Sequence, residues 1–339
     1  MLRAFRERES AFEGVFFAAV RTTGIFCRPT CSARLPRPEN LEFFATAGEA
    51  LAAGYRPCLR CRPLVPVGET PSWVEALLEA LERDPQRRWS DADLEARGLS
   101  PRQVRSWFQR EHGVTFHAFA RARRLGEALE RVQEGEAVTP VAFASGYDSL
   151  SGFHAAFRQF AGASPTAARG RRLIRLTRLT SPLGPLVAGA SDEALVLLEF
   201  ADRRAFPTQV RTLARRLRAQ FVPGRNAVLD RLRLELEAYF AGELQRFSLP
   251  LLAPGTPFQE SVWRALQELP PGTTCSYGEL AARIGRPTAV RAVASANGAN
   301  RLAIVIPCHR VVGADGSLTG YAGGLWRKRR LLELERSPA

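Results

Sequence analysis

The chain has 339 residues, enough for two or three domains with separate cores. Its content of 45% hydrophobic and 24% charged residues is that of a globular protein and excludes a disordered chain. The net charge is +14, and Lys328 is the only lysine, so arginine carries nearly all of the positive charge. This balance favours a polyanionic partner such as DNA, although an arginine-rich genome is an alternative explanation.

The N-terminal sequence and the length of the apolar runs indicate the cellular compartment of the protein. Residues 1–10 are charged and have no apolar centre, so we expect no signal peptide. No apolar run reaches about 18 residues, so we expect no membrane span. Both features favour a cytoplasmic protein, in which the six cysteines are more often metal ligands or nucleophiles than disulfides.

Three blocks follow one another along the chain. The first ends near Arg62, where prolines and glycine predict a linker. A helical block reaches about Arg172, and a third block begins with a strand over Leu173–Leu179. We expect an α+β multidomain protein with domains over residues 1–65, 72–172, 173–253 and 254–339.

The first block holds four cysteines in two close pairs, Cys27-x3-Cys31 and Cys58-x2-Cys61. Two such pairs can place four sulfurs around one tetrahedral Zn²⁺ ion. A four-thiolate site has no open position for a substrate, so the spacing alone favours a structural zinc site.

The residues around these cysteines, Val20–Cys31 and Tyr55–Pro63, resemble the N-terminal domain of the Ada family of adaptive-response regulators. The resemblance implies a small α/β domain in which Cys27 is both a zinc ligand and the acceptor of a methyl group from a DNA methylphosphotriester. Bound zinc would keep this thiol deprotonated. Methylation would remove one negative charge, strengthen DNA binding and switch the protein into an activator that works with RNA polymerase. The resemblance also implies contacts to the DNA backbone by Thr23, Arg34 and Arg60.

The second block contains a weak internal repeat with the pattern of a helix-turn-helix. Ala96–Pro101 and Ala144–Ser149 are glycine-containing turns, and each leads into an amphipathic helix. Between them, Phe116–Val132 is predicted to form one long helix that carries Arg121, Arg123 and Arg124. An ordinary helical bundle with glycine turns is the alternative.

This block resembles the paired helix-turn-helix domain of AraC-type transcription regulators. In that arrangement the second helix of each unit lies in the major groove, here of promoter DNA. The candidates for base contact are Arg102, Gln103 and Arg105 in the first unit and Ser151 and His154 in the second.

The third block begins as an α/β layer and becomes helical. A hairpin is predicted around Ser191–Glu193, followed by helices over Thr208–Gln220 and Ala227–Phe240. Further helices are predicted over Val262–Leu269, Tyr277–Ile284, Thr288–Ala296 and Trp326–Glu335.

A second cysteine of interest follows Ala303–Pro307, which is predicted to be a buried strand. Cys308 and His309 could form a nucleophile and its base. Neighbouring side chains of an extended segment point in opposite directions, and a buried cysteine is most often a small hydrophobic residue. The residues alone therefore leave both interpretations open.

The segment Pro307–Val311, with Asn297–Arg301 before it and Gly320–Leu325 after it, resembles O6-methylguanine-DNA methyltransferases over residues 181–336. The resemblance implies a ribonuclease H-like layer, a winged-helix-like helical part, and repair of double-stranded alkylated DNA. Cys308 would accept the methyl group of O6-methylguanine or O4-methylthymine, irreversibly and once. The other implied roles are His309 taking the thiol proton through a water, Glu335 orienting His309, Asn300 bracing the site, Tyr277 pressing on a DNA phosphate, and Arg291 filling the gap left by the flipped base.

Ala322 departs from this family, which often has serine there, so one hydrogen bond to the base is in doubt. Three other functions remain open. The C-terminal part could only bind damaged DNA, although the presence of Cys308 and Glu335 argues against this. The regulatory block could have decayed, or the chain could be a zinc-dependent or thiol hydrolase.

Overall fold

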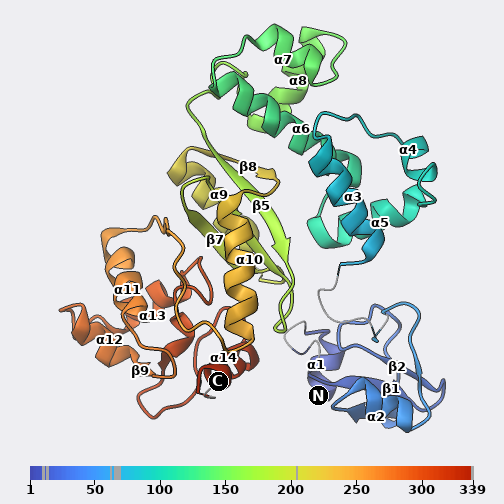
Figure 1. Cartoon of the computed structure of the whole chain (residues 1–339). Helices are drawn as coiled ribbons and strands as arrows, with labels where there is room; N and C mark the ends of the chain where they lie inside the picture. Colours follow the sequence, from blue (N-terminus) through green and yellow to red (C-terminus); the bar gives the residue numbers. More distant parts are fainter. Residues whose placement is uncertain (10–11, 13–14, 62, 65–69, 204, 337–339) are drawn as a thin grey trace.

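The computed structural model describes residues 1–9, 12, 15–61, 63–64, 70–203 and 205–336. Its elements form the mixed α+β multidomain architecture that the sequence predicts (Figure 1). The linker expected after Arg62 lies partly outside the described residues. No helix within these ranges combines the length and the apolar character needed to cross a lipid bilayer.

The N-terminal block is built on a four-stranded sheet in the order β3-β1-β2-β4. Its central strands pair antiparallel, whereas β2 and β4 pair parallel, with Phe26 opposite Pro57. This parallel pairing places the ends of two strands, and the cysteines that follow them, side by side. The elements are α1 (Leu2–Arg6), β1 (Phe17–Val20), β2 (Ile25–Cys27), a 3-10 turn (Pro38–Asn40), β3 (Leu41–Phe44), α2 (Ala47–Ala52) and β4 (Arg56–Pro57).

The second block is entirely helical and confirms the predicted pair of helix-turn-helix units. Gly98 and Gly146 occupy the two turns with φ values of 69° and 75°, a conformation that favours glycine. The Ser149 side chain caps the last helix by accepting a hydrogen bond from the Gly152 backbone N–H. The elements are α3 (Ser72–Arg83), α4 (Asp91–Glu95), α5 (Pro101–His112), α6 (Phe116–Gln133), α7 (Val138–Ala144) and α8 (Leu150–Ala161).

The long helix α6 forms as predicted, but two of its arginines face inward. Arg123 and Arg124 are 8% and 7% exposed. Arg123 Nη1 lies 3.8 Å from the Glu82 carboxylate, and Arg124 Nη1 donates to the Arg87 carbonyl at 3.3 Å. They therefore lie within the packing of α6 and add little to the exposed basic surface.

The third block begins with a four-stranded sheet in the order β7-β6-β5-β8. The predicted hairpin is confirmed, but the helix expected through Gln220 is wrong at its end. It stops at Leu217 because Arg218 has a φ of 48°, and the chain then pairs parallel with β5. The elements are β5 (Arg172–Leu179), β6 (Leu186–Ala190), β7 (Leu195–Phe200), α9 (Phe206–Leu217), β8 (Ala219–Pro223) and α10 (Ala227–Phe240).

The rest of the third block is mainly helical, as predicted, but one predicted strand and some predicted helix bounds are wrong. Ala303–Pro307 is a series of turns and not a strand, and Ile304 has a φ of 71°. The expected start of the helix at Thr288 is also early, because α13 begins at Val290. The elements are α11 (Pro257–Gln267), β9 (Cys275–Ser276), α12 (Tyr277–Arg283), α13 (Val290–Gly298), a 3-10 helix (Cys308–Arg310), β10 (Val311–Val312) and α14 (Leu325–Arg336).

The helical block docks onto the sheet of the third block through α6 (Figure 1). Arg175 on β5 lies 3.1 Å from the Glu127 carboxylate and 2.6 Å from that of Glu130. Gly126 faces Val222 so closely that an added Cβ would lie 3.0 Å from its side chain. A second contact joins β5 to the end of α5, where Arg178 Nη1 donates to the Glu111 carbonyl at 2.9 Å.

Candidate functional site

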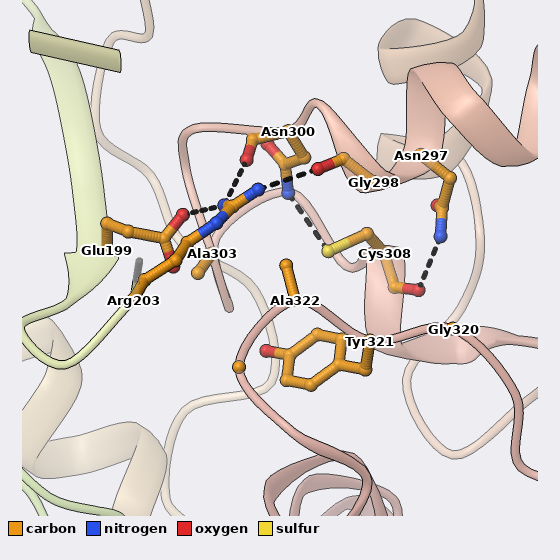
Figure 2. A pocket seen from close by; sticks show the side chains of 11 residues that line it. Glu199, Arg203, Asn297, Gly298, Asn300, Ala303, Cys308, Gly320, Tyr321 and Ala322 are labelled. Atoms are coloured by element: carbon orange, nitrogen blue, oxygen red, sulfur yellow. Dashed lines mark hydrogen bonds and ion pairs between the residues drawn. The ribbon is translucent and has the colours of Figure 1, made fainter. Parts of the chain in front are cut away.

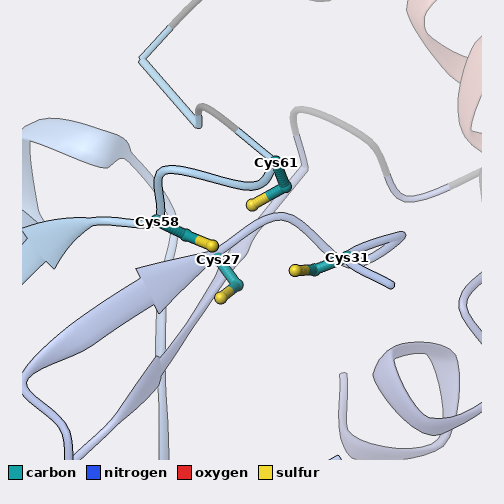
Figure 3. A group of neighbouring side chains, drawn as sticks. All are labelled: Cys27, Cys31, Cys58 and Cys61. Carbon is teal, nitrogen blue, oxygen red and sulfur yellow. The ribbon is translucent and has the colours of Figure 1, made fainter. Parts of the chain in front are cut away.

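The four cysteines of the N-terminal block converge from two loops (Figure 3). Their sulfurs all lie within 4.8 Å of one another. Cys27 ends β2, and the Cys58 backbone N–H donates to the Phe26 carbonyl at 3.0 Å, so strand pairing fixes their spacing. The Arg28 backbone N–H donates to the Cys61 sulfur at 3.3 Å. This is the donor set and the crowding that a tetrahedral Zn²⁺ site requires.

Four thiolates this close together would repel one another unless a cation were bound between them. Hydrogen bonds to Cys31 and Cys61, together with burial, raise the pKa of Cys27. Hydrogen bonds from Cys27 and Cys61 lower the pKa of Cys31 to about 2, because they stabilise its thiolate. A divalent cation removes this repulsion, so the four residues fit zinc.

Exposed polar residues surround the cysteine cluster. Thr23 lies in the turn between β1 and β2, and its hydroxyl donates to the Val20 carbonyl at 3.4 Å. Arg34 and Arg60 are exposed, and Arg60 Nη1 donates to the Ser32 carbonyl at 3.3 Å. The three residues with implied DNA contacts therefore lie on loops that also carry or adjoin the cysteines.

Cys308 lies at the bottom of a pocket between the sheet and the C-terminal helices (Figure 2). It is 7% exposed and begins a 3-10 helix. Asn300 Nδ2 donates to its sulfur at 3.1 Å, and Asn297 Nδ2 donates to its carbonyl at 3.3 Å. Burial raises the pKa of Cys308 to about 11, while the Asn300 hydrogen bond acts to lower it. Without a base the residue is a thiol at neutral pH.

His309 and Glu335 form a buried pair next to this cysteine. His309 Nε2 lies 2.9 Å from Glu335 Oε1. Burial alone would raise the pKa of Glu335, but hydrogen bonds from His309 and Arg310 outweigh it and hold the pKa below its usual value. The carboxylate is therefore ionised and accepts, so Nε2 carries the proton of a neutral imidazole. Burial also lowers the pKa of His309, which keeps the ring neutral near pH 7.

In an extended strand the side chains of Cys308 and His309 would point to opposite faces. The two residues lie in a 3-10 helix instead, so this argument against a nucleophile and its base does not apply. Within the described part of the chain, His309 Nδ1 has no hydrogen-bond partner although it is buried. This nitrogen is the acceptor that a nearby thiol proton would require.

The loop over the pocket leaves little space. The free volume is about 10 Å³, close to the room that one water needs. A Cβ added to Gly323 would lie 2.8 Å from the rings of Phe200 and Tyr321. The segment Tyr321–Gly323 therefore packs closely over the pocket that holds Cys308.

The remaining candidate DNA-contact residues lie in the helical block and in the C-terminal helices, and most of them are exposed. Arg291 is exposed on α13, whereas Tyr277 is half-buried and its hydroxyl donates at 3.4 Å to the carbonyls of Thr319 and Gly320. On α5, Arg105 Nη2 lies 3.6 Å from the Asp91 carboxylate. The remaining exposed candidates are Arg102 and Gln103 on α5 and Ser151 on α8, with His154 partly exposed.

The pocket and its surroundings contain residues that sequence reasoning did not single out. Tyr239, at the end of α10, donates to Glu335 at 2.9 Å. Glu199 and Arg203 line the pocket from the sheet side. Lys328 is fully buried and donates to the Thr319 carbonyl at 2.5 Å. Only Lys328 gave a signal in the sequence, as the single lysine of an arginine-rich chain.

Four protein-family models match successive parts of the chain. The metal binding domain of Ada matches residues 1–63, and a helix-turn-helix domain matches 95–171. The ribonuclease-like domain of 6-O-methylguanine DNA methyltransferase matches residues 174–253, and its DNA binding domain matches 257–337.

Individual proteins give the same picture. The chain is 36% identical to the bifunctional transcriptional activator and DNA repair enzyme Ada of Escherichia coli, over 97% of this chain and 93% of that protein. It is 45% identical to a methylated-DNA–protein-cysteine methyltransferase of Mycobacterium tuberculosis, over 49% of this chain and 95% of that protein. The crystal structure of the O6-methylguanine methyltransferase of M. tuberculosis is similar at 44% identity and a TM-score of 0.43, and covers 49% of this chain and 94% of that one.

Proposed function

The chain belongs to the Ada family of bifunctional transcriptional activators and DNA repair enzymes, and we propose that Cys308 and Cys27 are its two methyl acceptors. The observation that carries the proposal is the arrangement at Cys308. Its thiol lies at the bottom of a pocket, 3.1 Å from Asn300 Nδ2, in one short helix with a neutral histidine held by a buried carboxylate. This is a nucleophile, a base and a group that orients the base.

At Cys308 the substrate is O6-methylguanine, and O4-methylthymine as a second base. His309 Nδ1 takes the thiol proton through a water, and Glu335 stabilises the imidazolium that forms. The sulfur then attacks the methyl carbon. The S–C bond forms as the C–O6 bond breaks, and the electron pair remains on guanine, which regains a proton. Nothing on the chain reverses the thioether, so each site acts once.

The target base has to leave the DNA stack, which costs a few kcal/mol. Arg291 is exposed on α13 and fills the space that the base leaves. Tyr277 presses on the neighbouring phosphate, and its contact with the loop at Gly320 links that movement to the opening of the pocket. With Ala322 in place of serine, backbone groups of this loop contact the base.

At Cys27 the substrate is a methylphosphotriester of the DNA backbone. Bound zinc keeps the four sulfurs deprotonated at neutral pH. Thr23, Arg34 and Arg60 hold the DNA backbone beside the cluster. Transfer forms a thioether at Cys27 and returns the phosphate to a diester, so the cluster loses one negative charge while the DNA regains one.

This loss of charge is the switch to transcriptional activation. The helix-turn-helix units then read promoter DNA through Arg102, Gln103 and Arg105, and the complex recruits RNA polymerase at the nucleoid in the cytoplasm. The work is divided among residues 1–65 (phosphotriester repair), 72–172 (promoter binding), and 173–253 with 254–339 (base repair).

Peptide-resolved mass spectrometry tests the proposal. The full chain reacts with two duplexes, one with O6-methylguanine and one with a methylphosphotriester. We expect one methyl group on the Cys308 peptide after the first reaction and one on the Cys27 peptide after the second. Each Cys→Ser variant should lose only its own product. A methyl group on neither peptide would contradict the proposal and would favour a binding-only protein.

A further inference from the structure

One wall of the Cys308 pocket carries an ion pair that the reaction described above does not use. Glu199, at the end of β7, is 1% exposed, and the Arg203 guanidinium contacts its carboxylate (Figure 2). Both residues line the pocket. We infer that Arg203, held by Glu199, is a positioning residue for methyl transfer at Cys308, an inference that rests on the proposed function of that cysteine.

The guanidinium bridges the sheet and the segment that holds the cysteine. Nη1 of Arg203 donates to the Asn300 carbonyl at 3.1 Å, and Nη2 donates to the Gly298 carbonyl at 2.7 Å. These carbonyls lie at and just beyond the C-terminal end of α13, where backbone oxygens lack helical partners and a positive charge is favoured. Arg203 therefore fixes the turn that follows the helix.

The position of this turn sets the position of the asparagine side chain. Asn300 Nδ2 donates to both the Cys308 sulfur and the Ile306 carbonyl, and its Oδ1 accepts from the Leu302 N–H at 2.9 Å. With its backbone held by Arg203 and its side chain held on both sides, Asn300 has little freedom. Helix α13, whose end Arg203 contacts, also carries Arg291. Arg203 therefore connects this helix to the Cys308 sulfur through Asn300.

The two charges of the pair act on the Cys308 thiol in opposite directions. Burial raises the pKa of Cys308, and the positive charge of Arg203 opposes this effect, whereas Glu199 adds to it. Glu199 is restrained by a second donor, Gln209 Nε2, at 3.4 Å. The pair thus places a cation and an anion near the thiol, and replacing either one should shift the pKa of Cys308 in a different direction.

Single-turnover methyl transfer from an O6-methylguanine duplex tests the inference in the full-length protein. For Arg203→Met we expect the rate at saturating DNA to fall roughly 10- to 100-fold, the effect of losing hydrogen bonds from a charged donor. The half-saturating DNA concentration should stay near that of wild type, and the pH–rate profile should move to higher pH. Arg203→Lys keeps the positive charge but cannot donate to the Asn300 and Gly298 carbonyls at the same time. Its rate of methyl transfer should therefore fall, while its pH–rate profile should match that of wild type.

Glu199→Gln gives an effect of opposite sign. It keeps the shape of the side chain and removes the anion, so its pH–rate profile should move to lower pH. A purely structural role would not move the two profiles in opposite directions. Arg211→Met, an exposed arginine on α9, is the matched control and should leave rate and profile unchanged.

Transfer to Cys27 in the same molecules is the internal reference and should not change. An Arg203→Met protein with the rate and profile of wild type would overturn the inference, and so would an equal loss of transfer at both cysteines. If wild-type protein itself leaves Cys308 unmethylated, the proposed function fails, and that result is distinct from a normal Arg203→Met variant.

Discussion

Replacement of Glu335 by glutamine perturbs the centre of the Cys308 site. The carboxylate accepts two hydrogen bonds of 2.8 Å from Arg310 and one of 2.9 Å each from His309 and Tyr239. Glutamine keeps the volume but leaves Arg310, which is 5% exposed, without a counter-ion. Breaking a buried pair in this way costs about 3–5 kcal/mol. We expect the transition of the methyltransferase block to melt about 6–20 °C lower.

The pH dependence of this effect has a definite sign. The folded-state pKa of Glu335 is held below the unfolded value, so its stabilisation is fully present above the unfolded pKa. It is lost as the pH falls through the folded pKa, and the glutamine variant lacks this dependence. The two proteins should therefore converge in stability only in strong acid. The methyl-transfer rate should fall by up to about 100- to 10,000-fold, because His309 loses the negative charge that stabilises its imidazolium.

Calorimetry of the full chain and single-turnover transfer measure the two effects. Glu237→Gln is the matched control, since Glu237 pairs with Arg233 at 2.7 Å on the exposed face of α10. That change should cost less than about 1 kcal/mol and leave transfer intact. A Glu335→Gln protein that melts and reacts like wild type would refute the reasoning.

Three further changes have defined outcomes. Methylation of Cys27 removes a unit charge worth roughly 1–4 kcal/mol at about 4 Å, so affinity for promoter DNA should rise about tenfold or more at matched salt; equal affinity would remove the switch. Arg175→Glu should undock α6 from the sheet, seen as faster limited proteolysis between residues 162 and 171, and an unchanged cleavage rate would contradict the docking. Gly323→Ala should slow transfer at Cys308 because its Cβ would meet the Phe200 ring at 2.8 Å, whereas Gly170→Ala, with open space around it, should not.

Local patterns predicted the elements and the metal site well. The cysteine pairs specified four ligands because each pair is close in sequence and only one loop has to close, and the four sulfurs lie together. The helix-turn-helix repeat was visible because its turns require glycine at Gly98 and Gly146. Asn300 and Cys308 line one pocket, and His309 follows Cys308 in the same 3-10 helix.

Features fixed by distant contacts were not predictable. The strand at Ala219 exists because β5 offers it a partner, and the local sequence reads as a helix. Arg123 and Arg124 resemble a DNA-binding run until the packing of α6 buries them. Arg203 contributes to the pocket only because the fold brings α13 beside the end of β7, almost 100 residues away in sequence.

Lesion counting tests the central claim most directly. A variant with serine at both Cys27 and Cys308 is incubated in excess with DNA that carries O6-methylguanine and methylphosphotriesters, and the remaining lesions are quantified after digestion of the DNA. We predict that both lesions persist in full while wild-type protein removes one of each per molecule. Disappearance of either lesion with the serine variant would contradict the account.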